Sequence, residues 1–136
     1  MNTVSLADLE RSPEIVIGEN ERHKVTIAAM TDIAESSDHM DFLLYELDRA
    51  KVVPDTLVPP DVVRLGSIVR YKPGPGEERT IKLVMPADVE HPGNYRLSVT
   101  SAHGAALLGL KADAVMTWLD ASGTSHRIEV LKVANP

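Results

Sequence analysis

The chain has 136 residues, 43% of them hydrophobic and 25% charged, with a formal net charge of −6 at pH 7. This length and balance fit one folded domain, or a small domain with an appendage, and exclude a disordered or fibrous protein. No apolar run approaches the ~18 residues that a membrane span needs, and the lack of cysteine excludes disulfides, thiolate catalysis and cysteine-based zinc sites. We therefore expect a cytoplasmic protein with no membrane association and no cofactor.

The acidic residues are concentrated at the start of the chain. Residues 1–50 contain 11 Asp and Glu against 4 Lys and Arg, whereas residues 51–136 contain 9 against 10. Phosphate contacts require clustered Lys and Arg, so the first part does not resemble a nucleic-acid binder. An acidic helical segment suits a basic protein surface or a metal-bearing cleft, and the alternative is a solvated face that keeps the protein soluble.

The first elements expected along the chain are a tail, a short extended run and a helix. Residues 1–13 show little pattern and are predicted to form a flexible tail. A β-prone run over 13–17 ends at Gly18, and a helix is expected from Glu19 or Asn20. Its apolar residues recur at three- and four-residue spacings: Val25, Ala28, Ala29, Ile33 and Ala34.

A second helix is predicted after a turn at 35–38. Ser37 or Asp38 can cap it, and it ends near Ala50. Its apolar stripe consists of Met40, Leu43, Leu44 and Leu47. Two amphipathic helices joined by a short turn pack antiparallel, so we expect a helical hairpin, a short coiled coil, over residues 14–53. Each helix is ~20 Å long at about 1.5 Å per residue.

The rest of the chain, residues 54–136, is predicted to be a small antiparallel β domain. Eight of the nine prolines follow residue 50, so strands and turns replace helices there. About five strands are expected, with one short helix over 104–108, which makes the fold class α+β. The expected strands are 67–72, 79–85, 95–100, 115–120 and 126–133, and 62–64 is a further candidate.

Three segments, in this order and spacing, resemble the Gre-type transcription factors. They are Tyr45-Glu-Leu-Asp-Arg-Ala50, Leu83-Val-Met-Pro-Ala87 and Gly104-Ala-Ala-Leu-Leu-Gly109. The resemblance covers roughly residues 14–134 and is closest to the family's short-hairpin branch, named for regulation of nucleoside diphosphate kinase. It implies a helical hairpin attached to an FKBP-like domain. It also implies binding to RNA polymerase at the rim of the secondary channel, with the hairpin directed inward, in competition with Gre-type factors.

The hairpin turn departs from that of the transcript-cleavage factors in this family. Those factors have a longer hairpin, whose tip bears an acidic pair in a Gly-Asp-Leu-x-Glu-Asn-type motif that helps to hold a second metal ion in the polymerase. Residues 32–41 lack this motif. Glu35, Asp38 and Asp41 are the acidic candidates at the tip, either for contacts in the polymerase channel or, as the alternative, for helix capping alone.

The resemblance also points to residues that would contact the partner. We expect His103, Lys111 and one of Leu107 and Leu108 to lie on the polymerase-facing rim. The reason is that the helix is too short to bury both large side chains fully, and the alternative is that both leucines belong to the core.

Signals for other chemistry are weak in this sequence. The five histidines lack metal-ligand spacing, no nucleophile elbow surrounds a serine, and aromatics, at 4%, are too few for a prolyl isomerase pocket. We therefore expect no catalytic and no metal-binding residues. The first hypothesis is a monomeric, non-enzymatic transcription regulator that binds RNA polymerase and associates with DNA only through it. The alternatives are a binding module that regulates a nucleotide-metabolism enzyme, or a stimulator of transcript cleavage.

Overall fold

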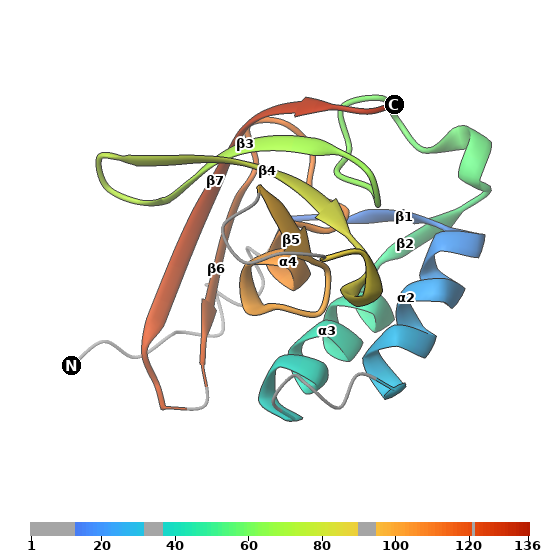
Figure 1. Ribbon diagram of the computed structural model, residues 1–136, viewed down its shortest axis with the longest axis horizontal. Coiled ribbons are helices and arrows are strands. Elements are labelled where there is room, and N and C mark those ends of the chain that lie inside the picture. The colour runs from blue at the N-terminus through green and yellow to red at the C-terminus, as the bar shows by residue number, and fades with distance from the viewer. Residues whose placement is uncertain (1–12, 32–36, 90–94, 121) are drawn as a thin grey trace.

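The structure is a computed structural model (Figure 1) that describes residues 13–31, 37–89, 95–120 and 122–136. Most of the predicted tail, Glu35 and most of the hairpin turn lie outside the described residues. Within the described ranges no helix is both long enough and apolar enough to cross a membrane.

Two helices form the predicted hairpin, and two short strands bracket it. α2 (Glu19–Thr31) and α3 (Ser37–Arg49) run in opposite directions and pack side by side (Figure 1). β1 (Val16–Gly18) pairs in parallel with β2 (Lys51–Val53), a pairing that the sequence patterns did not predict. The helix starts agree with the expected positions, and the chain enters and leaves the hairpin through one two-stranded ribbon.

The first turn of α2 is capped from outside the hairpin. Asp55, in the 3₁₀ turn η1 (Asp55–Leu57), accepts hydrogen bonds from the backbone N–H groups of Asn20 (2.9 Å) and Glu21 (3.3 Å). A Cβ at Gly18 would overlap the Asp55 carboxylate, so glycine leaves room for the cap. The amide hydrogen bonds, first of all that from Asn20, lower the pKa of Asp55.

Five strands form a curled sheet in the order β5–β4–β3–β7–β6. Their bounds are β3 (Ile68–Gly74), β4 (Glu77–Val84), β5 (Arg96–Ser98), β6 (Val115–Leu119) and β7 (Ser125–Ala134); the 3₁₀ turn η2 (Pro86–Asp88) follows β4. The expectation of mixed helix and sheet with about five strands is confirmed. The wholly antiparallel sheet is a wrong detail, because β4 and β5 pair in parallel. The FKBP-like topology and the coiled-coil geometry stay predictions.

The candidate strand over 62–64 is also wrong. Val62 forms only an isolated bridge to Lys111, and the N–H of Val63 donates to the carbonyl of Leu110 (2.8 Å). This segment pairs with the loop after the short helix instead of with a strand of the sheet.

The short helix α4 (Ala102–Leu107) is fixed by a cap and by two glycines. The Ser101 hydroxyl accepts a hydrogen bond from the N–H of Gly104 (3.1 Å), which is the usual serine N-cap. A Cβ at Gly104 would overlap the carbonyl of Ser98, and Gly109 has a φ of +84° beside Ile15. The two glycines of the 104–109 segment are therefore needed for the path of the backbone, Gly104 for space and Gly109 for its positive φ.

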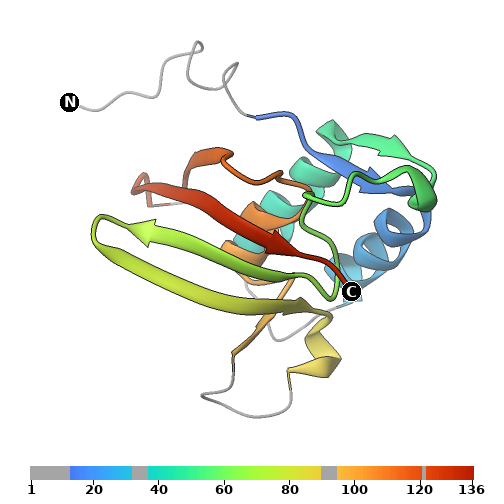
Figure 2. The same ribbon diagram turned by 90° about the horizontal axis from the view of Figure 1, so that it is seen from above.

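One hydrophobic cluster joins the hairpin to the sheet. Figure 2 shows α3 and α4 on the same side of the sheet, and α3 contacts α4 directly. Members of the cluster come from every layer, among them Leu43 and Leu47 of α3, Ala105 of α4, and Val69 and Val130 of the sheet. The division into a hairpin over 14–53 and a domain over 54–136 stays a prediction, and the two regions share this core.

Two buried carboxylates make polar contacts, one from α2 to the loop before the sheet and one within α3. Glu21 of α2 accepts a hydrogen bond from the N–H of Leu65 (3.1 Å), and Glu46 of α3 pairs with Arg49 (2.6 Å). Burial raises the pKa of both glutamates, and the hydrogen bonds from these partners and the positive charge of Arg49 oppose that rise. Arg49 also donates to the carbonyl of Pro13 (2.7 Å), which connects the end of α3 to the chain before β1.

Candidate binding site

Three stacked rings connect the helical hairpin to β6 and β7 at one edge of the sheet. Trp118 of β6 and His126 of β7 are paired across the antiparallel register, so their side chains share one face of the sheet. Their ring centroids are 5.1 Å apart with an interplanar angle of 18°. Phe42 of α3 stacks on Trp118 at 5.4 Å and 18°. Packing of this kind holds α3 against the β6–β7 hairpin.

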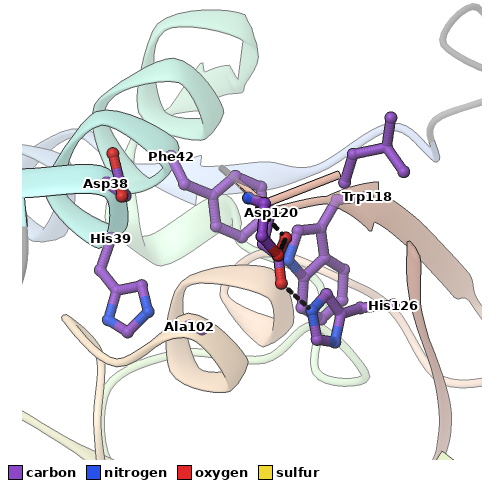
Figure 3. Close-up of a pocket in the computed structure, with 9 residues that line it drawn as sticks. Asp38, His39, Phe42, Ala102, Trp118, Asp120 and His126 are labelled. Atoms are coloured by element: carbon purple, nitrogen blue, oxygen red, sulfur yellow. Dashed lines mark hydrogen bonds and ion pairs between the residues drawn. The ribbon is translucent and has the colours of Figure 1, made fainter. Parts of the chain in front are cut away.

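A hollow of about 400 Å³ opens beside these rings (Figure 3). Asp38 and His39 enter it from the first turn of α3, and Trp118, Asp120 and His126 enter from the β6–β7 hairpin on the other side. The complete lining is Asp38, His39, Phe42, Ala102, Trp118, Leu119, Asp120, Ser122 and His126. The hollow thus lies where the hairpin, the start of α4 and the β6–β7 turn meet.

Asp120 organises the β6–β7 turn and carries a fixed negative charge. One carboxylate oxygen accepts hydrogen bonds from the Ser122 hydroxyl (2.6 Å), the Ser122 N–H (2.9 Å) and the Thr124 N–H (2.9 Å). The other is 2.8 Å from Nε2 of His126. These bonds, above all that from the Ser122 hydroxyl, hold the pKa of Asp120 well below its usual range, so it is ionised at neutral pH.

His103 lies beneath the stacked rings and contacts the sheet. Its Nδ1 is 3.2 Å from the Tyr71 hydroxyl, and its ring meets the rings of Tyr71 and Trp118 edge-on. Burial, followed by the nearby charge of Arg79, lowers the pKa of His103 below its ordinary value of 6.5. At neutral pH this histidine is therefore uncharged.

The structure places the predicted partner-binding residues in different environments. Lys111 is exposed and His103 is half-buried. Leu107 and Leu108 are 0% and 2% exposed, so the expectation that one of them lies on the rim is wrong. Both are core residues because α4 is covered by the sheet on one side and by α3 on the other.

The predicted tip residues are partly within the described region. Asp38 and Asp41 are both exposed on α3, but only Asp38 lines the hollow. Glu35 lies outside the described residues. The structure thus brings one predicted tip acid close to the start of α4, where Ala102 is also part of the lining.

Sequence reasoning missed the cluster of Phe42, Trp118, Asp120 and His126. The expected strands 115–120 and 126–133 contain Trp118 and His126, but the register that sets the two residues opposite each other on one face was not predicted. No local sequence pattern predicts the contact of Phe42 with Trp118, because this contact depends on how α3 packs against the sheet.

The described residues offer a binding surface and not a metal centre. Among them, no three or more His, Asp or Glu side chains come together in a way that could hold a metal ion. The lining combines apolar side chains with two carboxylates, an arrangement that suits a ligand with an apolar stem and a polar end.

Comparisons with known proteins converge on one family. Residues 58–135 match the family described as "Transcription elongation factor, GreA/GreB, C-term". The chain is 33% identical over 122 residues to the "Regulator of nucleoside diphosphate kinase" of Escherichia coli K12, with 89% of each chain covered, and equally to that of Shigella flexneri. It is also similar to the solved structure of a "Prokaryotic transcription elongation factor GreA/GreB" from Nitrosomonas europaea. That match has 32% identity and a TM-score of 0.68 and covers 90% of this chain and 99% of the other.

Proposed function

The chain belongs to the GreA/GreB family of transcription elongation factors, and we propose that it is a non-enzymatic transcription regulator that binds RNA polymerase near the secondary channel. In this proposal it competes there with Gre-type factors. Any association with DNA is indirect and passes through the polymerase.

One observation carries this proposal: the similarity extends over both parts of the chain. The family match alone covers residues 58–135 and so omits the hairpin. The Nitrosomonas europaea structure, in contrast, aligns with 90% of this chain, which requires most of the hairpin as well as the sheet. A factor that keeps both parts in one arrangement can bind the polymerase through its sheet domain while its helical hairpin points toward the channel.

The surface around the start of α4 is the proposed contact face. Lys111 is exposed after α4, His103 is half-buried within it, and the hollow beside Ala102 adds the acidic Asp38 and Asp120. The buried Leu107 and Leu108 support this face from below without contacting the partner.

A second candidate partner is a nucleoside diphosphate kinase. It is favoured by the names of the curated relatives, each called "Regulator of nucleoside diphosphate kinase". In this alternative the same fold is a binding module that acts directly on a nucleotide-metabolism enzyme.

Co-elution in gel filtration separates the two candidates. The purified chain should co-elute with core RNA polymerase and should not co-elute with nucleoside diphosphate kinase at the same concentration. The Lys111→Glu variant should co-elute less with polymerase, whereas Lys132→Glu, the same charge reversal at an exposed position of β7, should behave as wild type. Binding to the kinase alone would reject the polymerase proposal.

A further inference from the structure

The hollow beside the stacked rings carries negative charge over an apolar floor. Phe42, Ala102, Trp118 and Leu119 provide apolar surface, and the carboxylates of Asp38 and Asp120 lie on opposite sides (Figure 3). None of the nine lining residues is Lys or Arg, and Nε2 of His126 lies 2.8 Å from the Asp120 carboxylate.

The two carboxylates differ in what else they do. Asp120 uses one oxygen entirely within the β6–β7 turn and keeps the other directed at His126, so its position is fixed. Asp38 is exposed in the first turn of α3. A ligand between them would therefore meet one rigid and one adjustable acceptor.

We propose that this hollow receives an arginine side chain of the protein partner. The aliphatic stem of the arginine would cover Phe42 and Leu119, and its guanidinium would lie between Asp38 and Asp120. This inference rests on the proposed function, because the partner is taken to be the polymerase, and it names the chemistry that the site recognises.

Guanidinium fits these walls better than the other charged groups. It is planar, is weakly hydrated and carries five N–H donors, so it can pack against aromatic and imidazole rings while donating to two separate carboxylates. Ammonium is a compact, strongly hydrated charge that gains less from an apolar floor. An anion would be repelled by Asp120, which stays ionised at neutral pH.

The only tryptophan of the chain provides a direct readout of the site. Trp118 lines the hollow, so its fluorescence reports occupancy without a label. N-acetyl-L-arginine amide is the probe, and N-acetyl-L-citrulline amide, which has nearly the same shape but no charge, is the control. We expect saturable binding of the arginine probe with a Kd on the order of 1 mM and no saturation with citrulline.

Two neutralising variants test whether the charge that matters is the one in the hollow. Asp38→Asn should weaken binding of the arginine probe by about tenfold, because a charge-assisted hydrogen bond is lost. Asp48→Asn removes the same charge further along α3, at an exposed position outside the lining, and should leave probe binding unchanged. Melting temperatures of both variants check that the fold is kept.

The same variants then distinguish this inference from the proposed function. Wild type should bind core polymerase, Asp38→Asn should bind it several-fold more weakly, and Asp48→Asn should bind as wild type. Equal binding of arginine and citrulline, or polymerase binding that Asp38→Asn does not weaken, would overturn the inference and leave the proposed function standing. Absence of polymerase binding by wild type would overturn the proposed function, and with it the arginine of the polymerase as occupant.

Discussion

Gly104 and Gly109 meet different backbone demands at the two ends of one short helix. Gly104 has no room for a side chain because the carbonyl of Ser98 occupies that space, whereas Gly109 adopts a φ of +84° against Ile15. Both demands come from segments that are close in space, so each glycine connects α4 to a neighbouring strand. The 104–109 motif that resembles the Gre-type factors is therefore explained in this chain by folding.

The Gly104→Ala substitution should strongly destabilise the protein. The new Cβ forces α4 away from Ser98, and we expect the free energy of unfolding to fall by about 3 kcal/mol. Gly74→Ala is the matched control, since nothing lies within 4 Å of a Cβ at that position. Urea denaturation of both variants measures the difference; equal stability would show that α4 tolerates the displacement.

His103 should make stability depend on pH below neutrality. Its folded-state pKa lies below the ordinary value of 6.5, because burial disfavours the charged ring. The folded protein then binds fewer protons than the unfolded chain, so the free energy of unfolding should fall as pH drops from 6.5 toward the folded pKa. His103→Gln should flatten the curve in this window. An NMR titration of His103 with a midpoint above 6.5 would contradict the assignment.

At the scale of elements, the helical hairpin depends on a cap that comes from Asp55, a residue of η1 after the hairpin. Asp55 accepts from the N–H groups of Asn20 and Glu21 across more than thirty residues of sequence. Unpaired amides at a helix start destabilise its first turn. The geometry of α2 is therefore tied to the ribbon of β1 and β2 and to η1 after it.

The Asp55→Ala variant should loosen the start of α2. We expect faster hydrogen exchange at the amides of Asn20 and Glu21 and a lower melting temperature, while amides of β3 and β7 keep their order of protection. The control is Asp61→Ala, which removes an exposed charge from the same segment between β2 and β3. Because the bonds to Asn20 and Glu21 lower the pKa of Asp55, their contribution should be lost as pH falls below its ordinary value of 3.8. Unchanged exchange at Asn20 would mean that the cap does not stabilise α2.

Local patterns predicted these elements where spacing and turn residues determine them. The helices at 19–31 and 37–49 follow from apolar periodicity, and the strands β6 and β7 lie close to the expected ranges 115–120 and 126–133. The parallel pairs β1–β2 and β4–β5 were not predicted, because their partners are joined by long connections without a local signal. The stack of Phe42 on Trp118 was missed for the same reason.

At the scale of the whole molecule, the helical hairpin shares one hydrophobic core with the sheet and contacts α4 directly. Val25 and Ala29 of α2 and Leu43 and Leu47 of α3 belong to the same hydrophobic cluster as the inner face of the sheet. Each helix has 13 residues, which corresponds to about 20 Å at 1.5 Å per residue. The two described helices therefore form a short arm.

A hairpin of this length should not stimulate transcript cleavage. The described part of its tip contains Asp38 and Asp41, and the acidic tip motif of the cleavage factors is absent from the sequence. Backtracked elongation complexes given saturating protein and Mg²⁺ should release no more short RNA than complexes without it. Cleavage that disappears in an Asp38→Asn, Asp41→Asn double variant would show that the tip reaches the catalytic metal after all.

The central claim is that this chain and Gre-type factors share one site on RNA polymerase. The most direct measurement is an equilibrium competition in which fluorescently labelled protein bound to core polymerase is titrated with an unlabelled Gre factor. We predict complete displacement, with an apparent Kd for the labelled protein that rises in proportion to the Gre concentration. Saturation at a ternary complex, with both factors bound at once, would contradict it.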